Sequence, residues 1–145
     1  MIVDTIAFTQ GEMIPQKYTC EGQNLSPPLH LGNIPAGTKS LVVIVDDPDA
    51  PRGVFDHWIA WNIPVTENIS EGFPIATVGK NGFGVNGYRG PCPPSGETHR
   101  YFFKIYALDT LLDLPIGSSK AHVEEALRPH VLGRAEMMGK YKKGS

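Results

Sequence analysis

The run LVVIV at residues 41–45 restricts the fold of this chain more than any other feature, because five consecutive apolar residues give a strand no polar face. Such a strand has to be covered on both sides, so we expect it inside a layered protein. It leads directly into DDPDAP (46–51), which places three carboxylates and two prolines in six positions. Three carboxylates therefore follow a buried strand directly, and we expect them to have either a functional role or positively charged partners.

Further segments also have strand character. The segments FDHWIAWNI (55–63) and RYFFKIYAL (100–108) are rich in aromatic and β-branched residues, and residues 2–8 alternate between apolar and polar. Weaker strand patterns cover residues 29–31 and 140–142. Sixteen glycines and thirteen prolines indicate many turns between these short strands.

Helices are expected only late in the sequence. Ser118 and Ser119 can cap a helix over KAHVEEAL (120–127), which Pro129 then stops or kinks. A second short helix is predicted through HVLGRAEMM (130–138). Strands dominate and no βαβ alternation is present, so the sequence predicts an all-β sandwich with one or two short C-terminal helices packed at its end.

The bulk properties exclude several classes of protein. A chain of 145 residues is long enough for one domain, spanning 1–145. Its net charge of −2 does not suggest a nucleic-acid binder, and no apolar run approaches the roughly 20 residues of an integral membrane segment. The start lacks the regions of a signal peptide, so we expect a cytoplasmic protein. There Cys20 and Cys92 are most simply buried thiols, whereas a disulfide between them would indicate an oxidising setting.

Chemically useful side chains stand at the ends of the predicted strands. Asp47 and Asp49 follow strand 41–45, His57 opens the next strand, and His99 opens the third. Strands joined by a short loop usually run antiparallel, so both aspartates should lie near His57. His99 joins them only if the third strand begins at the same edge.

The stretch GKNGFGVNGYRGPCPPSGET (79–98) contains six glycines and three prolines. A structureless segment of this length is uncommon in a compact domain, and it indicates either a functional loop or a misread element. Glycines let the backbone approach a ligand closely, and exposed N–H groups in such turns can hold an anion.

DDPDAP, DHWIAWNIP (56–64) and GYRGPCPPSGETHRYFFKIYAL (87–108) together resemble the phosphatidylethanolamine-binding protein family, which includes the Raf kinase inhibitor protein. YTCEGQNLSPPL (18–29) and HVLGRAEMMGKY (130–141) resemble its bacterial and archaeal branch. The resemblance covers nearly the whole chain and implies a Greek-key antiparallel β-sandwich, a small anion-accepting pocket at one edge, and a homodimer. Members are described as binders or inhibitors of kinases and proteases more than as catalysts. No segment matches a kinase-binding surface, so Raf inhibition does not transfer with the fold.

The resemblance also implies which residues bind the ligand. Carried over residue by residue, they are Asp47, Asp49, His57, Tyr88, Gly90, Pro93, Pro94, His99 and Tyr101. Because carboxylates repel anions, we expect the aspartates to orient and charge the two histidines, which then donate to the ligand together with backbone N–H groups of residues 88–94. Asp49 has an equally simple structural role, accepting hydrogen bonds in its turn. Arg100 is expected to pair with an acid of the sandwich rather than with a ligand.

These observations favour a module that binds a small anionic ligand, such as phosphate, a phospho-head-group or a carboxylate, without a cofactor and without catalysis. Its partner would be a kinase or protease that it inhibits or regulates. The alternative is a metal-dependent hydrolase in which Asp47, His57 and His99 hold divalent iron or zinc. A third reading is an inhibitor that inserts its Pro93–Pro94 loop into another enzyme. Ser95 lacks the surroundings of a serine nucleophile.

Overall fold

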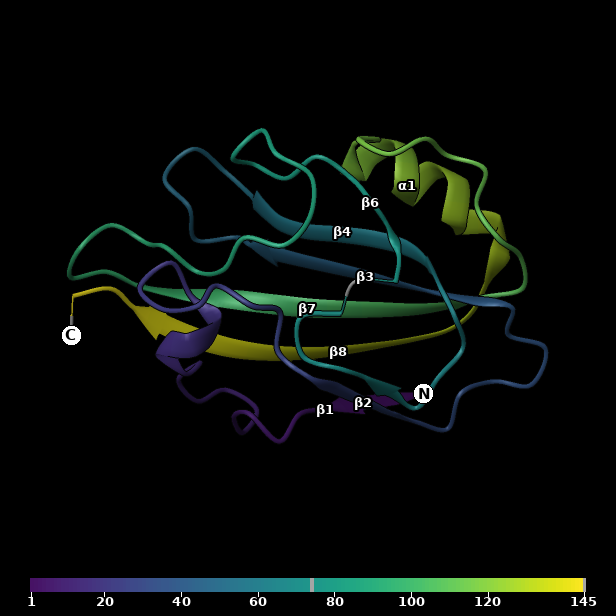
Figure 1. Cartoon of the computed structure of the whole chain (residues 1–145), viewed down its shortest axis with the longest axis horizontal. Coiled ribbons are helices and arrows are strands. Elements are labelled where there is room, and N and C mark those ends of the chain that lie inside the picture. The colour runs from purple at the N-terminus through teal and green to yellow at the C-terminus, as the bar shows by residue number, and fades with distance from the viewer. Residues whose placement is uncertain (74, 145) are drawn as a thin grey trace.

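The computed structural model describes residues 1–73 and 75–144, which form two antiparallel sheets, one short α-helix and two 3-10 turns (Figure 1). The larger sheet has the strand order β6-β4-β3-β7-β8, and the smaller one has the order β1-β2-β5. The strands are β1 (Ile2–Asp4), β2 (Leu29–Gly32), β3 (Ser40–Asp47), β4 (Phe55–Ile63), β5 (Asn68–Ile69), β6 (Thr77–Val78), β7 (Thr98–Leu108) and β8 (Val131–Lys142). The helical elements are η1 (Gln16–Tyr18), α1 (Lys120–Leu127) and η2 (Arg128–His130). The predicted β-sandwich is therefore confirmed.

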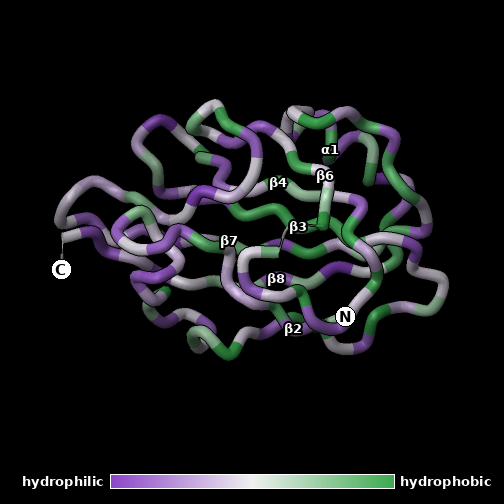
Figure 2. The backbone as a smooth tube through the Cα atoms, in the orientation of Figure 1, coloured by the Kyte–Doolittle hydropathy of each residue, from purple (hydrophilic) through white to green (hydrophobic). Residues whose placement is uncertain are grey.

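Strand β3 is the centre of the larger sheet, and every one of its eight residues is buried. Val43 and Val45 face the main core between the two sheets, whereas Val42 and Ile44 face a second core under α1. Figure 2 shows the hydrophobic colour following β3 and β4 inside the fold. The prediction that this strand is covered on both faces is confirmed.

Helix α1 covers the outer face of the larger sheet, where Figure 1 shows it above β4 and β6. It begins as predicted, because the hydroxyl of Ser119 accepts a hydrogen bond from the backbone N–H of His122 at 3.2 Å. Val123 and Leu127 point into the second core. Among the described residues no helix has both the length and the apolar character that crossing a bilayer demands.

The predicted second helix over 130–138 is wrong, because His130 ends η2 and residues 131–138 belong to β8, which pairs with β7 along its length. Ala, Glu and Met are good helix formers, but pairing with a neighbouring strand overrides their propensity. Gly139 lets the strand pack closely against Ile14, because a Cβ at this position would lie 2.6 Å from Cγ1 of Ile14. In the structure, buried and exposed residues alternate along β8 with the period of two that is typical of a strand.

The first strand is also shorter than expected, since β1 ends at Asp4 rather than continuing to residue 8. Thr5 accounts for the end of the strand. Its hydroxyl donates to the carbonyl of Pro28 and accepts from the N–H of Ala7, which turns the chain away from the sheet.

The register of the larger sheet brings the predicted site residues to one edge. Asp47 pairs with Phe55 across β3 and β4, and Asp46 pairs with Phe102 across β3 and β7. The end of β3 therefore meets the beginnings of both neighbouring strands. This confirms the antiparallel pairing expected from the sequence and fulfils the condition for His99 to join the aspartates.

Candidate functional site

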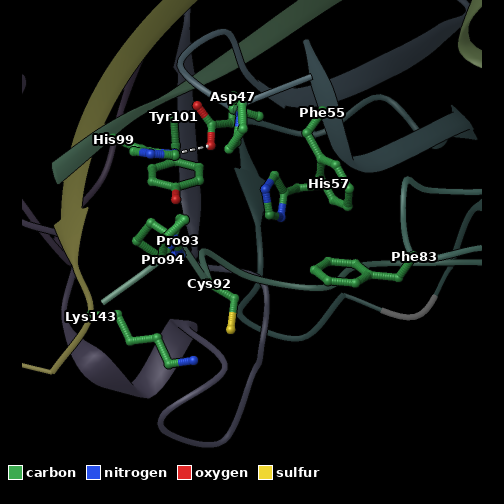
Figure 3. A pocket seen from close by; sticks show the side chains of 12 residues that line it. Asp47, Phe55, His57, Phe83, Cys92, Pro93, Pro94, His99, Tyr101 and Lys143 are labelled. Carbon is green, nitrogen blue, oxygen red and sulfur yellow. Dashed lines mark hydrogen bonds and ion pairs between the residues drawn. The ribbon is translucent and has the colours of Figure 1, made fainter. Parts of the chain in front are cut away.

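A cavity of about 330 Å³ opens at the edge where β3 ends and β4 and β7 begin. Its wall combines two histidines, three aromatic rings, prolines, one cysteine and one lysine (Figure 3). The lining residues are Asp47, Ala50, Pro51, Phe55, His57, Phe83, Cys92, Pro93, Pro94, His99, Tyr101 and Lys143. Six of the nine residues predicted to bind a ligand thus lie around one cavity, namely Asp47, His57, Pro93, Pro94, His99 and Tyr101.

His99 is held between two carboxylates. Its Nδ1 lies 2.7 Å from Oδ2 of the buried Asp47, and its Nε2 lies 3.0 Å from Oε1 of the exposed Glu97. Burial alone would lower the pKa of His99, but the hydrogen bonds to Glu97 and Asp47 outweigh it and raise the pKa. Asp47 therefore orients His99 and favours its protonated form, whereas a role of this pair in ligand binding stays a prediction. The sequence analysis expected His99 to donate to the ligand, but its Nε2 is already hydrogen-bonded to Glu97.

His57 differs from the cationic donor that the sequence predicted. Burial lowers its pKa, and this outweighs the opposing effects of the Arg89 carbonyl and the Asp47 charge. Its Nδ1 lies 2.7 Å from the carbonyl oxygen of Arg89 and donates to it, so in the neutral ring Nε2 is an acceptor. The rings of Phe55, Phe83 and Tyr101 surround the imidazole at centroid distances of 5.1, 5.8 and 5.2 Å.

Tyr101 supplies a donor that no described residue uses. Its side chain is fully buried, and its hydroxyl has no hydrogen-bond partner in residues 1–73 and 75–144. In Figure 3 the hydroxyl points away from Asp47 and toward Pro93 and Pro94. Burial and the charge of Asp47 both raise the pKa of Tyr101, so the hydroxyl keeps its proton. A buried donor of this kind requires an acceptor.

The long glycine-rich loop is an ordered wall rather than a flexible segment. Oδ1 of Asn81 accepts from the N–H of Phe83 at 2.9 Å, and Nδ2 of Asn81 donates to the carbonyl of Gly87 at 3.0 Å. These bonds place Phe83 beside His57. Further along, Pro93 and Pro94 close the opposite side of the cavity.

The prediction of two free thiols is wrong, because Cys20 and Cys92 form a disulfide across 72 residues of sequence. Both residues lie in loops, so sequence periodicity carried no information on their separation in space. The bond fixes the 88–94 loop to the N-terminal segment. A stable disulfide is typical of oxidising compartments or of proteins from hyperthermophiles, and so it weighs against the simple cytoplasmic expectation.

Asp49, Tyr88 and Gly90 do not line this cavity. Asp49 accepts two hydrogen bonds from the Arg100 guanidinium at 2.9 and 2.8 Å, which lower its pKa to about 2. Asp49 therefore has a structural role, but its donor is a distant arginine and not, as the sequence suggested, a backbone N–H of its own turn. The expectation that Arg100 pairs with an acid is confirmed.

Tyr88 and Gly90 hold the loop instead of facing a ligand. The hydroxyl of Tyr88 donates to the carbonyl of Tyr18 at 2.7 Å, and the N–H of Gly90 donates to Oδ1 of Asn24 at 2.7 Å. A Cβ on Gly90 would lie 2.0 Å from the same Tyr18 carbonyl, so only glycine allows this approach. The Gly90 N–H is thus not available for an anion, contrary to the predicted role of this loop.

Lys143 is the residue that sequence reasoning missed. Its half-buried side chain lines the cavity, and its ammonium forms no ion pair with any residue that the structure describes. The sequence showed Lys143 only as part of a short basic end. Its position became evident only when β8 was found to run beside β7 as far as Lys142.

The metal-dependent alternative lacks its ligand set in the described residues, in which no group of three or more His, Cys, Asp or Glu side chains is arranged to hold a metal ion. The geometry gives the reason. Both nitrogens of His99 are engaged by carboxylates, and Nδ1 of His57 is engaged by a backbone carbonyl.

The family model described as phosphatidylethanolamine-binding protein matches residues 4–142. The chain belongs to the phosphatidylethanolamine-binding protein family. A UPF0098 protein of Methanothermobacter thermautotrophicus is 50% identical over 99% of this chain and 100% of its own length. A UPF0098 protein of Pyrococcus horikoshii is 49% identical over 94% of this chain and 74% of its own length.

Two crystal structures of family members share the fold. A putative phosphatidylethanolamine-binding protein homologue from Chlamydia trachomatis is 42% identical and superimposes with a TM-score of 0.93, covering 98% of this chain and 97% of its own. YbcL of E. coli, a member of the mammalian family, is 34% identical with a TM-score of 0.88, covering 97% of this chain and 96% of its own. Membership of the family, expected from the sequence, is thereby confirmed.

Proposed function

We propose that this protein binds a small anionic group in the cavity between His57, Tyr101 and Lys143, and that it acts as a binding module rather than as an enzyme. The observation that carries this proposal is the buried Tyr101 hydroxyl, which has no partner in the described residues and lies in the cavity wall. A ligand oxygen would accept its hydrogen bond. Lys143 would supply the compensating positive charge from the other side of the cavity.

The chemistry of the wall restricts the ligand further. Tyr101 and Lys143 are donors, whereas Nε2 of the neutral His57 is an acceptor. A ligand that satisfies all three carries anionic oxygens together with one hydroxyl or N–H donor. A phosphate monoanion, a phospho-head-group with an ammonium, and a hydroxy acid all meet this requirement.

Three observations favour binding over catalysis. The imidazole of His99 is bonded on both sides by carboxylates, Ser95 is exposed outside the cavity wall, and no thiol is free because both cysteines form the disulfide. Regulation of a kinase or protease stays a prediction. It requires that the partner present a phosphate or carboxylate to this cavity.

The experiment is a calorimetric titration of the oxidised protein with inorganic phosphate and with phosphoethanolamine. Tyr101→Phe removes the hydroxyl but keeps the ring, so we expect phosphate affinity to fall about tenfold with little change in folding. Lys143→Gln should cause a loss of similar size. Lys39→Gln makes the same change in net charge at an exposed residue before the opposite end of β3, and it should leave the affinity unchanged.

Phosphate binding that survives both Tyr101→Phe and Lys143→Gln would place the anion elsewhere and reject this site. The absence of binding by the wild-type protein for both ligands would reject the proposed function itself. Zinc binding lost in His57→Ala and His99→Ala would instead support the metal-dependent alternative.

A further inference from the structure

The Cys20–Cys92 disulfide joins an exposed residue to a residue of the cavity wall. Cys20 is exposed, whereas Cys92 is half-buried and lines the cavity (Figure 3). Cys92 also lines a second cavity on the other side of the disulfide, together with Cys20. Cys20 is thus the half of the bond that lies nearer to solvent, while Cys92 belongs to the wall that faces the ligand.

The residues around Cys20 hold the other parts of the cavity as well. The N–H of Cys20 donates to the carbonyl of Pro91 at 3.1 Å, next to the Pro93–Pro94 wall. The neighbouring Glu21 accepts from the hydroxyl of Tyr141 and from the N–H of Gly144. Figure 1 shows the loop before β7 and the end of β8 at the same end of the sandwich.

The turn at Cys20 and Glu21 thus fastens both sides of the anion site. The disulfide ties it to the proline wall, and Glu21 ties it to the residues on either side of Lys143. No other covalent link joins these segments in the described chain. A change at the disulfide therefore acts on both the shape and the charge of the cavity.

We propose that the Cys20–Cys92 bond is a thiol–disulfide exchange site and that its redox state sets the affinity of the cavity for anions. The inference rests on the proposed function. The oxidised form is the one that binds, and reduction by a dithiol protein or a small thiol releases the ligand.

The reaction balances without any group beyond the reductant. A thiolate of the reductant attacks Sγ of the exposed Cys20, the disulfide breaks, and its electron pair leaves with Sγ of Cys92. The second thiol of a dithiol reductant, or a second molecule of a small thiol, then resolves the mixed disulfide and releases Cys20. Two electrons and two protons pass to the protein, and the reductant becomes a disulfide.

Reduction weakens anion binding in two ways. The 92–96 segment loses its covalent anchor, so a ligand must order that wall on binding. In addition, the free Sγ of Cys92 lines the same cavity as Lys143, and it competes with the ligand for that positive charge whenever it is deprotonated. The hydrogen bonds of Tyr88 and Gly90 remain, so the sandwich stays folded while the pocket alone loosens.

The test compares the phosphate affinity of the oxidised and the dithiothreitol-reduced protein by calorimetry, with the near-UV circular dichroism of both forms recorded as a check on folding. We expect the reduced protein to bind about fivefold more weakly. The double variant Cys20→Ser, Cys92→Ser is the matched control. It should bind more weakly than the oxidised wild type, and its affinity should not respond to dithiothreitol.

A second measurement tests the same coupling from the other side. In glutathione buffers, alkylation and mass spectrometry give the fraction of disulfide with and without saturating phosphate. Because linkage is reciprocal, phosphate should shift this equilibrium toward the disulfide by the same factor.

The outcomes separate the two proposals. Equal phosphate affinity of both redox forms overturns the exchange site and leaves the proposed function intact. A disulfide that is reduced only after the protein unfolds also overturns the exchange site. A lack of phosphate binding by the oxidised protein overturns the proposed function, and phosphate then also leaves the glutathione equilibrium unchanged.

Discussion

Asp46 and Asp47 are neighbours in sequence and almost equally buried, yet they serve opposite faces of the same sheet. On the helix side, Oδ2 of Asp46 lies 3.0 Å from Nζ of Lys104 and 3.4 Å from Nζ of Lys120. On the cavity side, Oδ2 of Asp47 lies 2.7 Å from Nδ1 of His99. Successive residues of β3 point to opposite faces, so one carboxylate joins the group under α1 and the other lines the cavity.

The difference lies in the partners. Lys120 also lies 2.8 Å from Oδ1 of Asp56, so the helix side is a closed group of four charges that docks α1 on the sheet. The cavity side instead ends in an imidazole with a raised pKa beside an open cavity. A pair of acid and lysine holds its charge over a wide pH range, whereas a pair of acid and histidine changes its charge near neutrality. The two aspartates therefore differ in how their ion pairs respond to pH, since only the pair with His99 is expected to change its charge near neutrality.

The largest effect is expected on the helix side. Asp46→Ala leaves two lysine ammonium groups without their shared carboxylate, and we expect the free energy of unfolding to fall by about 2 kcal/mol. Urea denaturation measures this loss. Asp113→Ala removes the charge of an exposed aspartate and is the control. A change in phosphate affinity of Asp46→Ala by more than about twofold would show that the two faces are coupled.

Asp47→Asn should act mainly on the site. It keeps the shape of the side chain but removes the charge that helps to raise the pKa of His99, so we expect phosphate affinity at about pH 6 to fall roughly tenfold. Calorimetry at fixed pH measures the effect. Stronger phosphate binding in this variant would mean that Asp47 chiefly repels the ligand, contrary to the role given to it here.

The pH dependence follows from the sign of the shift. The pKa of His99 is raised above its ordinary value of 6.5, so its stabilising contribution is complete below that value and is lost as pH rises through the raised pKa. Anion affinity should decline over the same window. Lactate, a hydroxy acid that meets the requirement of the cavity, is the probe, since its carboxylate stays ionised between about pH 6 and 9. Calorimetry should show the decline in wild type and in Asp46→Ala, and a flat profile in His99→Gln.

The smallest effect is expected from Glu97. Its exposed carboxylate is bonded to Nε2 of His99, where it competes with an anionic ligand. Glu97→Gln removes this competition but also lowers the pKa of His99, and we expect phosphate affinity to rise two- to threefold at about pH 6. Glu125→Gln changes the same charge on the exposed side of α1, and calorimetry should show no change there. A weaker phosphate affinity in Glu97→Gln would make Glu97 a supporting residue rather than a competitor.

Sequence reasoning succeeded where local pattern and short connections decide the structure. The unbroken apolar run of β3 predicted a central strand, and the short connection to β4 predicted that Asp47 would meet His57 at one edge. It failed where distant pairing decides. Residues of β8 have the composition of a helix, and only the partner strand β7 holds them extended.

The site shows the same division. The motif positions His99 and Tyr101 were found, but the neutral state of His57 depends on burial and on the carbonyl of Arg89. Neither is visible in the spacing of residues. The contribution of Lys143 to the wall and the disulfide at Cys92 likewise depend on contacts between distant segments, which a single sequence does not record.

The order in which the wall is synthesised has a consequence for the cell. Asp47 emerges from the ribosome early, His57 and His99 follow, and Lys143 comes last of all the residues that line the cavity. Until β8 is paired with β7, the nascent chain has Asp47 and His99 in place but lacks the lysine of the cavity wall. On the proposed function, anion binding requires that β8 has paired with β7, so a ligand at hand would favour chains in which this pairing has formed.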